Sequence, residues 1–203
     1  MANDDSPRGL IPYNHDAGVG IKTHVYEAAS SGAGGPIFIG QPVVLVAAGH
    51  VENAAPAGAS GVATLYLGVA VGFLAENYGV PTVPFNDTGG TTKRYVIVAD
   101  DPNQRFVAQE DTGGTALTLN ERGASADLIF RAGASGNNTT GFANLEIDAS
   151  TVLTTNSGAV TLLQLQDIVN SDGTQNAVGD FGKWIVRITN HQMRGQSMVN
   201  VNV

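Results

Sequence analysis

Glycine and proline interrupt this chain so often that no stretch suits a long helix. The 203 residues include 26 glycines and 8 prolines, and the segments between them alternate apolar with polar side chains over short distances. Proline fixes one backbone angle and removes an N–H donor, whereas glycine adopts turn conformations that other residues avoid. This punctuation is typical of many short strands joined by turns. We therefore predict an all-β fold, an antiparallel β-sandwich or barrel of short strands with extended N- and C-terminal arms.

Ten segments combine alternation of period two with flanking turn residues. The expected strands are residues 21–26, 41–45, 63–73, 95–99, 105–109, 117–119, 126–130, 145–147, 160–168 and 183–190. Residues 95–99 and 105–109 flank a turn that contains Pro102, so we expect them to form a hairpin. In the last segment Trp184 shares one face with other apolar residues, so we expect its side chain to be buried.

The two ends of the chain differ from the segment between them. Residues 1–14 contain Pro7 and Pro12 and few apolar side chains, and residues 192–203 finish in valines that alternate with asparagines. Neither end holds enough apolar surface to order itself alone. We therefore expect an N-terminal arm over residues 1–14, a single β domain over residues 15–191 and a C-terminal tail over residues 192–203.

Charge, hydropathy and the lack of cysteine exclude several classes of function. The net charge is −8, and no basic cluster is longer than Lys93-Arg94, so we expect no nucleic-acid partner. The longest mostly apolar run, residues 62–75, is shorter than the roughly 20 residues that cross a bilayer, so we expect no membrane partner. Without cysteine there is no disulfide, thiolate nucleophile or Cys-based metal site. Residues 1–10 (MANDDSPRGL) lack the pattern of a signal peptide, which favours a cytoplasmic start.

The side chains that could support catalysis do not form a recognisable motif. The four histidines stand at no spacing that places two on one face of an element, so no metal site is predicted. In the expected hairpin, Asp100 and Asp101 lie at the tip while Glu110 and Asp111 lie about 16 Å away at the open end. We interpret these carboxylates as a solvated turn and strand end, with a calcium site or an acid–base pair as the alternatives. No cofactor is predicted.

Several motifs, in this order along the chain, resemble head decoration or cement proteins of tailed bacteriophages, which stabilise capsids. They are residues 1–3 (MAN) with 7–10 (PRGL), 37–44 (IFIGQPVV), 68–73 (GVAVGF), 98–102 (VADDP) with Phe106 and 109–111 (QED), 126–129 (ADLI), 148–151 (DAST) and 182–191 (GKWIVRITNH). The chain departs from this family by extending well beyond His191.

The resemblance implies a non-enzymatic virion structural protein. Its expected partner is a phage major capsid protein, and its expected location is the capsid exterior after assembly in the host cytoplasm. We expect a homo-oligomer, a dimer or a trimer, on the capsid. The alternative is a β-sandwich surface-binding module such as a carbohydrate- or host-binding domain.

The two ends are the expected sites of contact with the capsid or with neighbouring subunits, because a partner would offset the cost of ordering them. The predicted interface residues are Asn3, Asp4, Asp5, Pro7, Arg8, Leu10, Met198, Val199, Val201 and Val203.

Overall fold

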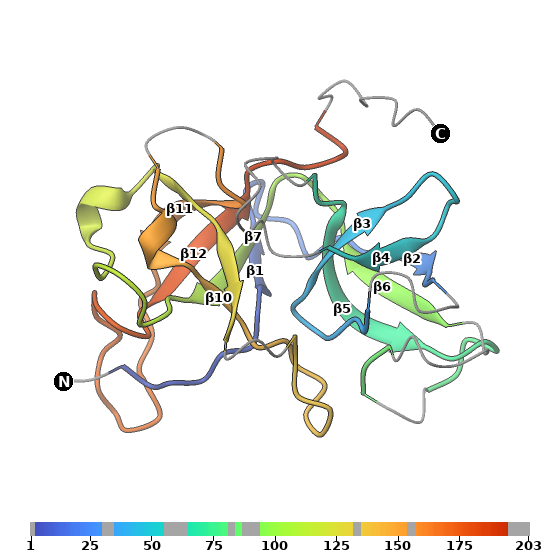
Figure 1. Ribbon diagram of the computed structural model, residues 1–203, viewed down its shortest axis with the longest axis horizontal. Helices are drawn as coiled ribbons and strands as arrows, with labels where there is room; N and C mark the ends of the chain where they lie inside the picture. Colours follow the sequence, from blue (N-terminus) through green and yellow to red (C-terminus); the bar gives the residue numbers. More distant parts are fainter. Residues whose placement is uncertain are drawn as a thin grey trace.

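The fold is a β-sandwich. The computed structural model describes residues 3–29, 35–54, 65–80, 84–86, 94–131, 135–153 and 157–194. Within these residues the chain is nearly all β, and its antiparallel sheets pack as a sandwich that does not close into a barrel. Figure 1 shows one five-stranded sheet on the left and the other on the right. The predicted fold class is therefore confirmed as a sandwich.

The first sheet has the order β1-β7-β12-β11-β8. Its strands are β1 (Ile11–His15), β7 (Gln104–Gln109), β8 (Ser125–Ala126), β11 (Val160–Leu165) and β12 (Lys183–Ile188). The strand that comes last in the sequence, β12, lies in the middle of this sheet between β7 and β11.

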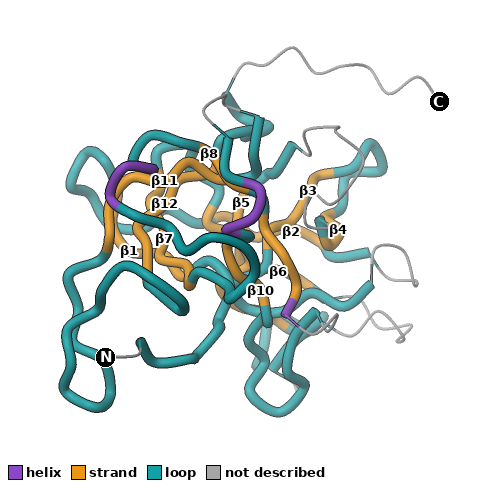
Figure 2. Tube along the Cα trace, turned by 60° about the vertical axis from the view of Figure 1, so that its left-hand side comes forward, coloured by secondary structure: helices purple, strands orange, loops and turns teal. Residues whose placement is uncertain are grey.

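The second sheet has the order β2-β6-β5-β3-β4. Its strands are β2 (His24–Glu27), β3 (Pro42–Leu45), β4 (Val51–Asn53), β5 (Gly68–Leu74) and β6 (Tyr95–Ala99). A separate pair joins β9 (Leu128–Phe130) to β10 (Leu145–Ile147). Two short 3-10 helices, η1 (Leu119–Glu121) and η3 (Ala149–Thr151), are drawn in purple in Figure 2.

Both sheets and the β9–β10 pair contribute to one hydrophobic core. The largest fully buried side chain is Trp184 of β12, which is 0% exposed, as its position in the alternating pattern predicts. Phe106 of β7 and Val98 of β6 belong to the same cluster, although they come from different sheets. The core therefore joins the two sheets into one unit.

The predicted hairpin between residues 95–99 and 105–109 is wrong. Both strands exist, but β6 pairs with β2 and β5 in the second sheet, whereas β7 pairs with β1 and β12 in the first. Residues 100–103 therefore cross between sheets. Two carboxylates hold this crossing: Asp100 is bonded to His24, at 2.8 Å, and to the hydroxyl of Tyr26, and Asp101 lies 3.0 Å from His15 of β1. Turn residues of this kind suit a crossing as well as a hairpin.

Other local predictions also needed correction. Residues 117–119 form no strand, because Thr118 caps η1 and Glu121 accepts a hydrogen bond from the Thr118 N–H in a capping box. Strands β1 and β4 were not predicted. The expected strand over residues 160–168 ends as β11 at Leu165, and residues 63 and 64 of the expected strand over residues 63–73 lie outside the described residues.

Candidate interaction site

The N-terminal segment, defined here as residues 3–10, lies on the domain rather than extending from it. Its first residue, Asn3, is 8% exposed, and its side chain bonds the backbone of another loop three times. The amide donates to the carbonyl oxygens of Ala177 and Asp180 at 2.9 and 3.0 Å and accepts from the Ala177 N–H at 3.0 Å. In Figure 1 the segment runs from the left edge of the molecule to β1.

Polar contacts hold the next residues of this segment. Asp5 forms an ion pair with Arg131, which lowers the pKa of the Asp5 carboxyl below its usual value. The Ser6 N–H donates to Gln109 Oε1 at 2.8 Å, and the hydroxyl of Ser171 donates to Asp4 at 2.7 Å. The segment is thus fixed mainly by hydrogen bonds and charge.

A close crossing of two segments of the chain also anchors the N-terminal segment. Gly9 and Gly40 both have positive φ angles, and a Cβ on either would collide with a main-chain oxygen of the other segment. At this crossing the Leu10 N–H donates to the Gly40 carbonyl at 2.8 Å, and the Leu10 side chain is 0% exposed. The crossing ties the N-terminal segment to the loop before β3.

The predicted interface residues therefore separate into three groups. Asn3 and Leu10 are buried within their own chain, where they anchor the segment, and their role as partner contacts stays a prediction. The other four N-terminal residues lie at or near the surface, namely Asp4, Asp5, Pro7 and Arg8. The four C-terminal residues lie outside the described residues, namely Met198, Val199, Val201 and Val203. The predicted boundary after residue 14 falls inside β1, which pairs with β7 in the first sheet.

Replacing Asn3 with alanine is expected to destabilise the protein by about 1–3 kcal/mol, because buried partners of the amide lose their hydrogen bonds. The measurement is urea unfolding, and limited proteolysis checks whether the N-terminal segment is released first. Asn120→Ala is the matched control, since Asn120 is exposed. Equal unfolding midpoints for the two variants would show that Asn3 anchors nothing.

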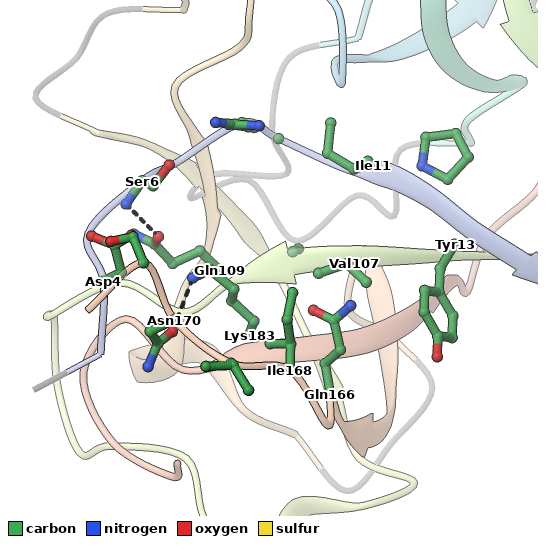
Figure 3. A pocket seen from close by; sticks show the side chains of 16 residues that line it. Asp4, Ser6, Ile11, Tyr13, Val107, Gln109, Gln166, Ile168, Asn170 and Lys183 are labelled. Atoms are coloured by element: carbon green, nitrogen blue, oxygen red, sulfur yellow. Dashed lines mark hydrogen bonds between the residues drawn. The ribbon is translucent and has the colours of Figure 1, made fainter. Parts of the chain in front are cut away.

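A groove of about 350 Å³ lies beside the N-terminal segment on the outer face of the first sheet (Figure 3). One wall is formed by the N-terminal segment and β1, including Tyr13. The floor includes Val107 of β7 and Lys183 of β12, and the other wall is residues 166–171. The groove combines apolar side chains with uncharged hydrogen-bonding groups and with three charged side chains, those of Asp4, Arg8 and Lys183.

The side chain of Gln166 has an acceptor atom at this groove that lacks a hydrogen-bond donor in the described part of the chain. The side chain is 9% exposed, and its Oε1 has no hydrogen-bond partner among the described residues. Its backbone is fixed on both sides, because its N–H donates to the Lys183 carbonyl at 2.8 Å and its carbonyl accepts from Asn176 at 2.7 Å. A buried acceptor without a donor is costly, so a donor from a bound molecule would stabilise it.

Two of the four carboxylates near the strand ends, Glu110 and Asp100, are buried, contrary to the prediction of a solvated turn and strand end, whereas Asp101 and Asp111 are partly exposed. Glu110 is 0% exposed and accepts from the Leu117 N–H at 2.6 Å and from Trp184 Nε1 at 3.1 Å. Burial raises the pKa of Glu110 to about 7. Asp100, at the crossing between the sheets, is also buried, at 4% exposed. Glu110 and Asp100 stabilise the fold, because each accepts hydrogen bonds from donors elsewhere in the chain.

The histidines lie in separate surroundings. His24 contacts Asp100 and His50 contacts Glu52, while His191 is 1% exposed and accepts from the Met193 N–H. Burial lowers the pKa of His191 to about 4. No group of three acidic or histidine side chains in the described residues could hold a metal ion.

Comparisons with known proteins returned no relative. No family model, curated protein or solved structure matches the chain. None of the helices in the described part of the chain has the length and apolar character that crossing a membrane requires.

The groove and the anchor of the N-terminal segment were missed at the level of sequence. The wall residues are far apart in the chain, and only the alternation of Ile11, Tyr13 and His15 could have indicated β1. Nothing in the local sequence marks Asn3 or Gln166 as special, because their partners are fixed by tertiary structure.

Proposed function

We propose that the chain is a non-enzymatic structural protein of a phage virion, which binds the outer surface of the capsid lattice and stabilises it. The resemblance of the sequence to decoration proteins suggests this role. The structural observation in its favour is the N-terminal segment, whose ends are anchored at Asn3 and Leu10 while Asp4, Pro7 and Arg8 remain at or near the surface.

An anchored segment suits a weak, repeated contact. Its backbone is ordered by folding, so a partner need not supply the roughly 1–2 kcal/mol per residue that ordering a free arm would cost. A capsid presents many equivalent sites, and a dimer or trimer of the chain would gain effective concentration by occupying several of them. The partner in this proposal is the major capsid protein, on the outside of the particle.

Charge reversal at Arg8 is expected to weaken capsid binding. Arg8 is exposed, with its guanidinium 5.4 Å from the centre of the Phe142 ring. Arg8→Glu should lower occupancy of capsids about fivefold at subsaturating protein, because it reverses a charge in the contact, and salt should weaken wild-type binding. Arg122→Glu is the matched control, since Arg122 is also exposed.

Occupancy is measured by sedimenting capsids that lack the protein after mixing, followed by gel densitometry. The same particles are heated with and without bound protein, and bound protein should raise the temperature at which the shell opens. Failure of the wild-type protein to sediment with capsids would refute the proposal. Equal binding by the two arginine variants would move the interface away from the N-terminal segment.

A further inference from the structure

We propose that the groove beside the N-terminal segment binds residues 198–203 of a second copy of the chain as an extended strand. This deepens the proposed function, because it names a contact between neighbouring subunits. It can nevertheless be tested without capsids.

The groove gathers exposed apolar side chains that the fold does not use. Tyr13 is 46% exposed, Ile168 38% and Val169 54%, and all three line the groove together with Ile11 and Val107. Large aliphatic side chains that are clustered and half exposed mark interaction sites more often than scattered ones do. With a single aromatic ring among them, they suit aliphatic side chains better than the faces of sugar rings.

Gln166 adds a specific requirement. Its amide lies at the groove, as Figure 3 shows, and its Oε1 lacks a donor. A peptide in extended conformation carries N–H donors and C=O acceptors along its length, so it can meet both groups of an amide side chain. The groove therefore fits a peptide with aliphatic side chains on one face.

The tail of this chain has that pattern. Residues 198–203 read MVNVNV, and in a strand Val199, Val201 and Val203 project from the same face. Residues 195–203 contain no charged side chain, so they avoid the repulsion that a protein of net charge −8 exerts on an acidic partner.

The last described residues lie at the second sheet and at the crossing between the sheets, where Arg194 donates to the Pro102 carbonyl at 2.6 Å, and not at the groove. Gln192 is bonded to both backbone groups of Leu45 in β3, so the chain lies against the second sheet there. The groove, in contrast, is on the outer face of the first sheet. A tail that reaches a neighbour's groove would link subunits in series or in a closed ring.

The test uses protein that ends at Arg194 and a fluorescent synthetic peptide of residues 195–203. Fluorescence anisotropy should show saturable binding with a dissociation constant of about 10–1000 µM, as expected for a small interface. Ile168→Asp should weaken binding about tenfold, because it places a charge where a valine would pack. Ile129→Asp is the matched control, since Ile129 is also 38% exposed but lies in β9 away from the groove.

A second variant and a second measurement complete the test. Gln166→Leu should weaken peptide binding about threefold or more without lowering the melting temperature, because it removes the Oε1 acceptor that has no partner among the described residues and keeps the size. Full-length protein should associate with rising concentration in sedimentation velocity, and protein that ends at Arg194 should not.

Two results would overturn the inference. One is equal peptide binding by Ile168→Asp and Ile129→Asp proteins. The other is full-length protein that stays monomeric and binds the peptide only after its own tail is removed, which would place the tail in its own groove. Neither result bears on whether the protein binds capsids, so the two proposals fail separately.

Discussion

Replacing Trp184 with alanine is expected to lower the free energy of unfolding by about 3–5 kcal/mol. The side chain is fully buried on β12, the strand between β7 and β11, and it belongs to the core that joins both sheets. Truncation would leave a large cavity. It would also remove the Nε1 donor that lies 3.1 Å from Glu110 Oε2, so a buried carboxylate would lose a partner.

Urea unfolding followed by far-ultraviolet circular dichroism measures this loss. Trp184→Phe is the control that keeps an aromatic ring and removes the donor, and it should cost less than half as much as alanine. An unfolding midpoint for Trp184→Ala equal to that of the wild type would mean that Trp184 does not contribute to the core.

The contribution of Glu110 to the stability of the protein is expected to fall as the pH rises from about 4.5 to about 7. Burial raises the pKa of Glu110 from 4.5 to about 7, so the folded state binds this proton more tightly than the unfolded state does. Stability is therefore greatest below the unfolded pKa and is lost as the pH passes through the folded pKa. Since one pKa unit corresponds to about 1.4 kcal/mol, the full loss from Glu110 is about 3.5 kcal/mol.

Other carboxyls shape the same profile. Burial also raises the pKa of Glu146, Asp111 and Asp127, which steepens the fall in the same direction. The pKa of Asp101 is lowered to about 2, chiefly by the Asn103 N–H, so its stabilising contribution is lost only below about pH 4. The lowered pKa of His191, about 4, acts in the opposite direction: stability rises as the pH rises from about 4 to about 6.5, so the contribution of Glu110 is measured as the difference between the wild type and a Glu110 variant.

Glu110→Gln should remove the falling contribution of Glu110, so the free energy of unfolding of the variant should rise relative to that of the wild type between pH 5 and 8. The amide has no charge to bury, although it cannot accept from both Leu117 and Trp184 and so costs some stability at low pH. Free energies of unfolding are measured in urea at pH 5, 6, 7 and 8, with the exposed Glu76→Gln as the control. An unchanged slope in Glu110→Gln would assign the pH dependence to other groups.

Strand positions could be predicted from the sequence where alternation is strong. The predicted bounds of β6 and β10 match the structure, and β12 was found with its buried face, because alternation and turn residues are local signals. The partners of each strand could not be predicted in the same way. Residues 100–103 carry a turn signal that fits a hairpin and a crossing equally well, and the choice depends on where β1 and β2 lie.

The candidate site was predictable only in part. The weak apolar content of residues 1–14 predicted an extended arm, whereas residues 3–10 lie on the domain and are held there by polar contacts. The anchors of this segment were not predicted, because the partners of Asn3 are backbone groups more than 170 residues away. The burial of Glu110 was missed for a similar reason, since its donor Trp184 comes from the other end of the domain.

The central place of β12 also sets an order of events during synthesis. β7 emerges from the ribosome well before its neighbour β12, since Gln109 precedes Lys183 by more than 70 residues. Until residue 188 is available, β7 and β11 each expose an unpaired edge to solvent. The first sheet can therefore close only when nearly the whole domain has been made, and this interval is when the nascent chain most needs protection from aggregation.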